Sequence, residues 1–149
     1  MNNKWIWLDM DGTIASLYSV NGWLDDLIAQ STRPYEIAES IYDTDIILVL
    51  AELKAKGYNI GVISWGSKNS TDEFLDRVTR AKKEWLYEHL FDLVLDKIIV
   101  THYGVSKSET CKKYGYGILV DDEQQNRDSW ELGDTINANE DILEILKNL

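Results

Sequence analysis

Short apolar runs and amphipathic stretches alternate along this chain of 149 residues. The apolar runs are nearly unbroken, which is typical of parallel strands with helices packed on both faces of the sheet. They predict strands at Lys4 to Leu8, Tyr58 to Ile63, Leu93 to Val100, Gly117 to Val120 and, in a weaker pattern, Asp134 to Asn137. We therefore expect an α/β fold of three layers, with a Rossmann-like parallel sheet in the middle.

Amphipathic helices are predicted between these strands. The segment from Thr44 to Gly57 begins with capping residues, keeps its apolar side chains on one helical face and ends at a glycine. The segment from Thr71 to His89 follows the same pattern, with an inner stripe formed by Phe74, Val78, Ala81 and Trp85. A closing helix is expected from about Asn139, with these side chains facing inward: Ile142, Leu143, Ile145, Leu146 and Leu149.

Residues 14–43 fit neither pattern as clearly. They contain several aromatic residues and the only proline, Pro34. We interpret them as a small helical cap insert, or lid, above the first strand. The chain shows no internal repeat and no low-complexity linker, so we expect one domain across residues 1–149.

Composition and charge narrow the choice of partners. With 44% hydrophobic residues the chain is not disordered, and at this length it can bury about 70% of its unfolded surface. A formal net charge of -11 repels the phosphates of long nucleic acids. No apolar run reaches the roughly 18 to 20 residues of a membrane span, and the N-terminus lacks a secretory segment. We expect a soluble, cytoplasmic protein without a membrane partner.

Two pairs of aspartates follow apolar runs. In "WIWLDMDGT", Asp9 and Asp11 are one residue apart and point the same way on an extended chain, and Gly12 allows a sharp turn. In "GILVDD", Asp121 and Asp122 end another run in the same manner. If these two strands are parallel neighbours, four carboxylates meet at the edge of the sheet where α/β folds bind ligands.

Such a cluster requires protons or a cation. Two like charges about 4 Å apart repel by about 4 kcal/mol at an effective dielectric constant of about 20. An all-oxygen site with room for water suits Mg²⁺. The alternative for either pair alone is that the carboxylates only cap turns or helices at the strand ends.

Two further segments carry groups that bind phosphate. In "NIGVISWGS" a buried strand ends on Ser64, followed by Trp65 and Gly66, where a hydroxyl and free backbone N–H groups suit phosphate oxygens. In "GVSKSET", Ser106 precedes a glutamate at capping-box spacing, which places Lys107 in the first turn of a helix. Taken alone, Lys107 has the pattern of a solvated surface lysine, and only the order of the four elements changes that interpretation.

That order, "DMDGT", a strand-end serine, a helix-start lysine and then "DD", resembles the haloacid dehalogenase superfamily of phosphotransferases. The resemblance extends from about Lys4 to Asn126, with residues 14–43 at the place of the variable cap. It implies the superfamily's fold and Mg²⁺-dependent hydrolysis of a small phosphomonoester. The "DMDG" segment also looks like the 5'(3')-deoxyribonucleotidases of the superfamily, which implies a substrate such as a 5'-nucleotide.

The resemblance assigns a role to each motif residue. Asp9 is the nucleophile that becomes an aspartyl-phosphate, and Asp11 is the general acid and base. Ser64 and Lys107 bind the phosphoryl oxygens. The residue types agree with this chemistry, because a carboxylate can accept a phosphoryl group and an acid can protonate the leaving oxygen. Carbon–halogen chemistry needs no acid for its leaving group, so an aspartate at position 11 argues against it.

The resemblance also implies a metal site. Mg²⁺ is held by Asp9, by the backbone carbonyl of Asp11 and by the acidic pair, with Asp122 expected as the direct ligand and Asp121 as its support. The superfamily often has a further acid four residues after that ligand. Here the position is Asn126, so the outer surroundings of the metal depart from the pattern.

Trp65 has two interpretations. It directly follows Ser64 and can stack on a base or a sugar ring, with Tyr18 and Trp23 of the lid assisting. Alternatively it packs under the edge of the sheet, since large aromatic residues are mostly buried.

Two other classes of function stay open. The first is a noncatalytic phospho-acceptor, similar to a signalling receiver domain, although a receiver does not need an acid beside its nucleophile. The second is a pseudoenzyme that binds a nucleotide or a partner protein without turnover. The phosphatase could also act on the ends of polynucleotides, but the net negative charge of the chain disfavours such a substrate.

Overall fold

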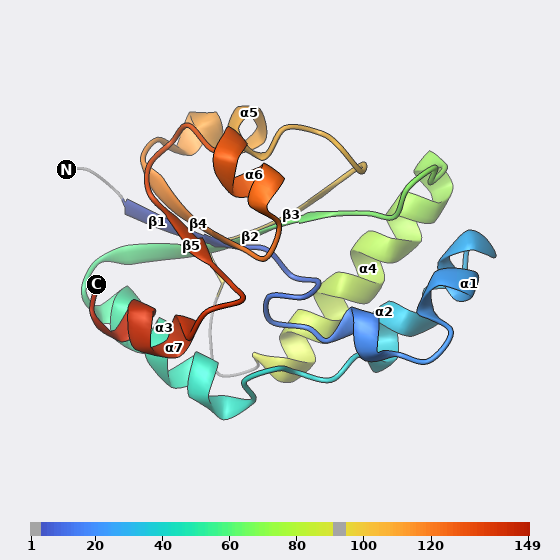
Figure 1. Cartoon of the computed structure of the whole chain (residues 1–149), viewed down its shortest axis with the longest axis horizontal. Coiled ribbons are helices and arrows are strands. Elements are labelled where there is room, and N and C mark those ends of the chain that lie inside the picture. The colour runs from blue at the N-terminus through green and yellow to red at the C-terminus, as the bar shows by residue number, and fades with distance from the viewer. Residues whose placement is uncertain (1–3, 91–94) are drawn as a thin grey trace.

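A five-stranded parallel sheet forms the centre of the computed structural model, which describes residues 4–90 and 95–149 (Figure 1). The strand order is β3-β2-β1-β4-β5, and every neighbouring pair is parallel. The strands are β1 (Lys4–Leu8), β2 (Tyr58–Trp65), β3 (Lys97–Thr101), β4 (Gly117–Asp121) and β5 (Thr135–Asn137). The expected α/β fold is therefore confirmed.

Helices cover both faces of the sheet. Figure 1 shows α5 (Lys107–Cys111) and α6 (Gln124–Ser129) on one face, and α3 (Thr44–Ala55) and α7 (Ile142–Lys147) on the other. A large apolar core lies between the sheet and α3 and α7, and a smaller one rich in tryptophan lies on the opposite face. Burial of alternate strand side chains in these two cores accounts for the nearly continuous apolar runs.

The predicted helices agree with the structure in their main parts. Helix α4 (Asp72–His89) begins where expected, because the Thr71 side chain accepts the backbone N–H of Phe74 at 3.1 Å. The four residues of its predicted stripe are buried. The closing helix begins later than Asn139, since Asn139 lies in a turn and the Asp141 side chain caps the helix. Leu149 was expected to face inward, but it is exposed.

The third strand begins later than predicted. Part of the predicted segment, residues 93–94, lies outside the described residues, and β3 itself starts at Lys97. The carboxylate of Asp96, rather than a main-chain carbonyl, accepts the backbone N–H of Ile60 at 2.8 Å. The backbone N–H of Asp96 in turn donates to the carbonyl oxygen of Ile60 at 2.9 Å, so Asp96 bonds both main-chain groups of Ile60 just before β3 begins.

Residues 14–43 contain the short 3₁₀ turn Leu17–Ser19 and the helices α1 (Trp23–Ile28) and α2 (Arg33–Ile37). Their apolar side chains form a separate small cluster with one face of α4, to the side of the sheet (Figure 1). The indole N–H of Trp85 on α4 donates to the carbonyl oxygen of Ala38 at 2.7 Å, which ties the end of this segment to α4.

No helix within the described part of the chain combines the length and the apolar character needed to cross a membrane.

The sheet order brings the predicted motifs together. Strand β1 lies between β2 and β4, and Leu8 pairs with both Val62 and Val120. The residues that follow these three positions therefore meet at one edge of the sheet. Asp9 and Asp121 directly follow Leu8 and Val120, and Ser64 comes two residues after Val62.

Candidate active site

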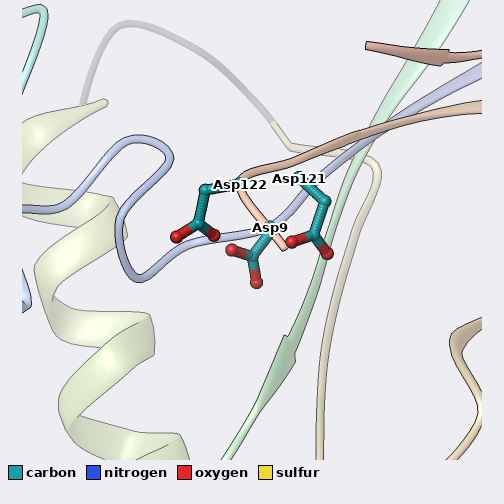
Figure 2. Close-up of side chains that lie close together, drawn as sticks. All are labelled: Asp9, Asp121 and Asp122. Carbon is teal, nitrogen blue, oxygen red and sulfur yellow. The ribbon is translucent and has the colours of Figure 1, made fainter. Parts of the chain in front are cut away.

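Three carboxylates share one small space at the carboxyl ends of β1 and β4. Asp9, Asp121 and Asp122 each offer an oxygen, and these atoms all lie within 4.8 Å of one another. Figure 2 shows the three side chains gathered at the ends of the two neighbouring strands. Asp9 and Asp121 are buried, and Asp122 is half-buried. A set of hard oxygen donors of this kind could hold a divalent cation such as Mg²⁺.

Lys107 provides the positive charge of this cluster. Its ammonium donates to Asp9 Oδ1 at 2.9 Å and to Asp121 Oδ2 at 2.7 Å. The predicted N-cap forms, with Ser106 Oγ accepting the backbone N–H of Glu109 at 3.1 Å, and Lys107 lies in the first turn of α5. Lys107 is buried, so it is not the solvated lysine that its local pattern alone indicates.

The charges of the cluster are not balanced. Burial lowers the pKa of Lys107, but the carboxylates of Asp9 and Asp121 raise it by more, so this lysine stays charged. Burial and the charge of Asp9 raise the pKa of Asp121. The same two causes raise the pKa of Asp122 to about 8. One ammonium is thus too little for three carboxylates, which is the condition that favours a bound cation.

Asp121 and Asp122 differ in how far their oxygens are used. Asp121 Oδ1 accepts the backbone N–H of Glu123 at 2.9 Å, and its Oδ2 accepts from Asn126 at 3.2 Å as well as from the lysine. Within the described residues, the carboxylate of Asp122 accepts only one long hydrogen bond, of 3.5 Å from the Thr13 hydroxyl, and Asp122 lines the adjacent cavity. Asp122 is therefore the freer of the two carboxylates within the described chain.

The turn after β1 depends on a glycine, as predicted. Gly12 has a φ of +79°, a conformation that side-chain-bearing residues rarely adopt. A Cβ atom at this position would lie 2.4 Å from Asp122 Oδ2. The turn also brings the Thr13 hydroxyl within 3.1 Å of Asp9 Oδ2, so that both oxygens of Asp9 accept hydrogen bonds.

Asp11 does not join the other three carboxylates, which corrects the expectation that all four would meet. Its Oδ2 accepts a hydrogen bond from the ammonium of Lys82 at 2.8 Å. Lys82 lies on α4 and its side chain is 0% exposed. Burial raises the pKa of Asp11 by more than the Lys82 ammonium lowers it.

Lys82 is the residue that the sequence analysis missed. It is four residues after Val78 and three before Trp85, so it occupies a position on the apolar stripe of α4. Lysine is almost never fully buried unless it is paired. The available signal was therefore a lysine at a position of the apolar stripe, and the predicted stripe included only the apolar residues.

The end of β2 is arranged partly as expected. Ser64 is buried, and its Oγ accepts a hydrogen bond from Lys82 at 2.7 Å. The backbone N–H of Gly66 donates to the carbonyl oxygen of Thr101 at 2.7 Å. This N–H is therefore not free for a phosphate oxygen, contrary to the expectation for the turn.

Trp65 borders the site and is half-buried. Its indole N–H donates to the carbonyl oxygen of Val105 at 2.7 Å, and its ring centroid lies 4.9 Å from that of Tyr103. The Lys107 ammonium is 5.3 Å from the centre of the Trp65 ring. The indole is thus held by its N–H and by its contact with Tyr103, while the residue lines the cavity.

A cavity of about 460 Å³ opens above these groups. Its floor includes Asp9, Asp11, Lys107 and Asp122. Its walls are mainly apolar and aromatic. They come from the segment 14–43, from the end of β2 and from the loop after β3: Leu17, Tyr18, Trp23, Leu24, Leu27, Ile28, Tyr35, Trp65 and Tyr103. The volume is that of a small-molecule site.

No family model matches the sequence, and no curated protein matches it either. Among solved structures, the chain is similar to a D,D-heptose 1,7-bisphosphate phosphatase from Burkholderia thailandensis, with a TM-score of 0.61, 11% identity, and coverage of 98% of this chain and 97% of that one. It is also similar to a D,D-heptose 1,7-bisphosphate phosphatase from B. bronchiseptica complexed with magnesium and phosphate, with a TM-score of 0.52, 12% identity and 97% coverage of both chains. At these identities the likeness shows a shared fold.

Proposed function

We propose that this chain is a Mg²⁺-dependent phosphatase that hydrolyses a small phosphomonoester through an aspartyl-phosphate on Asp9. The observation that carries the proposal is the buried Lys107 ammonium between Asp9 and Asp121, with Asp122 beside them and a cavity above. The shared fold with a phosphatase complexed with magnesium and phosphate supports it.

The metal ligands in this proposal are Asp9, Asp122 and the backbone carbonyl of Asp11. Asp121 supports them, because its oxygens already accept from Lys107, Asn126 and a backbone N–H. When bound, Mg²⁺ supplies the positive charge that lets an anionic carboxylate approach a phosphate dianion.

Asp9 acts as the nucleophile. Its carboxylate oxygen forms a bond to phosphorus while the ester P–O bond breaks. Lys107 lies 2.9 Å from Asp9 Oδ1, so it places a positive charge where the phosphoryl oxygens arrive. The Ser64 hydroxyl accepts from Lys82, which leaves its own hydrogen free for a phosphoryl oxygen.

Asp11 acts as the acid and then as the base. It lines the cavity, and it gives its proton to the leaving oxygen as the ester bond breaks. It next takes a proton from the water that attacks the phosphorus, and the bond between phosphorus and Asp9 breaks. Burial raises the pKa of Asp11, which favours the protonated form that the first step needs.

The proposal extends to a 5'-nucleotide as the substrate, with residues 14–43 as the lid over it. Tyr18 and Trp23 form an edge-to-face pair with ring centroids 5.0 Å apart, and both line the cavity opposite Trp65. Flat aromatic walls suit a nucleobase. Among the described lining residues the cations are Lys68 and Lys107, which suits a single phosphate group better than a second one.

The test is phosphate release in the presence of Mg²⁺ from nucleoside monophosphates, sugar phosphates and 4-nitrophenyl phosphate, with Asp9→Asn as the control. Release by the wild type that is lost in the variant supports the proposal, and the panel ranks the substrates. Mg²⁺ binding without release from any compound would favour a noncatalytic phospho-acceptor instead.

A further inference from the structure

Lys82 forms a junction between α4, the end of β2 and the loop after β1. Its ammonium donates to Asp11 Oδ2 at 2.8 Å, to Ser64 Oγ at 2.7 Å and to the carbonyl oxygen of Trp65 at 2.7 Å. An ammonium has three hydrogens, so these contacts use all of them. We infer that Lys82 is a positioning residue that fixes the carboxylate of Asp11 for proton transfer, an inference that rests on the proposed function.

Lys82 acts through Asp11 and not on the substrate. Its side chain is 0% exposed, and the ring of Tyr35 from α2 covers it with the ammonium 4.7 Å from the ring centre. A substrate atom could reach the ammonium only by displacing one of its three partners. Asp11, in contrast, lines the cavity.

The three contacts of the Lys82 ammonium have two roles: two of them fix the ammonium, and through the third the ammonium fixes Asp11. Ser64 and the Trp65 carbonyl belong to β2, which is paired with a strand on each side, so they hold the ammonium in a fixed place. The ammonium in turn holds Oδ2 of Asp11, which lies on a loop. Within the described chain Asp11 Oδ1 accepts no hydrogen bond, so this oxygen is left for the proton of the reaction.

Stability is a weak reason for a lysine at this position. The desolvation of a buried ion pair offsets most of its attraction, and apolar side chains of similar size often serve as well. The neighbours of Lys82 on the stripe, Val78 and Trp85, are apolar and buried. The gain from Lys82 is therefore geometric, because a general acid contributes only when it is held within reach of the leaving oxygen.

The experiment compares Lys82→Met with Lys83→Met, the adjacent lysine on the same helix, in kcat/KM for two substrates. One is a nucleoside 5'-monophosphate, which is an alkyl phosphomonoester, and the other is 4-nitrophenyl phosphate, whose leaving group departs without a proton. We expect Lys82→Met to lower kcat/KM by about 100-fold for the alkyl ester and by less than about tenfold for the aryl ester. Most of the loss should lie in kcat, and Lys83→Met should match the wild type.

A double variant keeps the test decisive if Lys82→Met folds poorly. Lys82→Met with Asp11→Asn removes both charges of the pair, so that no buried charge is left unpaired. If Lys82 acts through Asp11, the double variant should be no more than about threefold less active than Asp11→Asn alone. Equal losses on both esters, or losses that multiply in the double variant, would overturn the inference while the phosphatase proposal stands.

A wild-type protein that hydrolyses neither ester would overturn the proposed function itself, and the role of Lys82 with it. These failures are distinguishable, because in the first case the wild type and Lys83→Met are both active.

Discussion

Two buried lysines contact the aspartates that follow β1, and their surroundings are opposite in kind. Lys107 lies among three carboxylates at the floor of the cavity, where the negative charge exceeds the positive. Lys82 lies behind the cavity with one carboxylate, one hydroxyl and one carbonyl oxygen, and these use its three hydrogens. The first arrangement takes up protons or a cation to balance its charge, whereas the second is complete within the chain.

This difference separates two tasks in one site. A surplus of negative charge costs free energy in the empty protein, but it becomes favourable when a divalent cation binds. A network in which every polar group already has a hydrogen-bond partner does not attract ligands, but it keeps its side chains in place. The Lys107 side is thus suited to binding and the Lys82 side to positioning, and each prediction below changes one side.

Asp9→Asn should have the largest effect on activity. An amide cannot serve as the nucleophile, so turnover should fall by about 10⁴-fold or more, whereas Lys107 keeps Asp121 as a partner and the fold should persist. Phosphate release and circular dichroism measured on the same preparation check both parts. Residual activity near that of the wild type would remove Asp9 from the nucleophile's role.

Asp122→Asn should come next. Its carboxylate is the freer one of the acidic pair, so its loss should raise the Mg²⁺ concentration needed for half-maximal activity by about 10- to 100-fold. The matched variant is Asp121→Asn, which should act mainly by disturbing Lys107. An unchanged metal titration in Asp122→Asn would transfer the role of direct ligand to Asp121.

Trp65 touches both sides of the site. Its carbonyl oxygen accepts from Lys82 and its ring lies near Lys107, so the substitution Trp65→Ala keeps the first contact and removes the second. If the ring stacks on a base, kcat/KM should fall by about tenfold for a nucleoside monophosphate and much less for glycerol phosphate. Tyr87→Ala, an exposed aromatic residue on α4, serves as the control. Equal losses on both substrates would indicate a packing role.

The smallest effect concerns pH and stability without metal. The pKa of Asp122 is raised to about 8 in the folded protein, above its unfolded value near 3.9, and those of Asp11 and Asp121 are raised too. The folded state then binds more protons than the unfolded state, so stability should decrease as the pH rises from about 4 to 8. In the presence of a chelator, the midpoint temperature of thermal unfolding should fall by a few degrees as the pH rises from about 4 to 8.

Added Mg²⁺ should flatten that slope, because a bound cation favours the charged carboxylates. Asp122→Asn should reduce the slope in the chelator, whereas Lys83→Met should leave it unchanged. A midpoint that is constant with pH, or that rises with it, would mean that the surplus charge is absent from the Lys107 side.

Most of the fold was predictable because it depends on local patterns. Apolar runs placed β1, β2, β4 and α3 close to their observed positions, and the Thr71 cap placed the start of α4. The capping residues expected at Thr44 and Asp45 lie inside α3, which begins without a side-chain cap. The predicted starts of β3 and α7 were wrong, and at both places a side chain accepts a backbone N–H. These are the Asp96 carboxylate beside β3 and the Asp141 cap of α7.

The amino-acid sequence by itself determined which groups stand at the strand ends, because a motif such as "DMDG" carries its own turn and its own carboxylates. It also placed Lys107 in the first turn of a helix through the Ser106 cap. Only the tertiary structure decided which of the charged groups form ion pairs with one another. Asp11 and Lys82 are 71 residues apart, and they meet because α4 packs beside the sheet and turns one polar position of its apolar stripe toward the site. Contacts of that kind depend on how whole elements pack, and no local pattern records them.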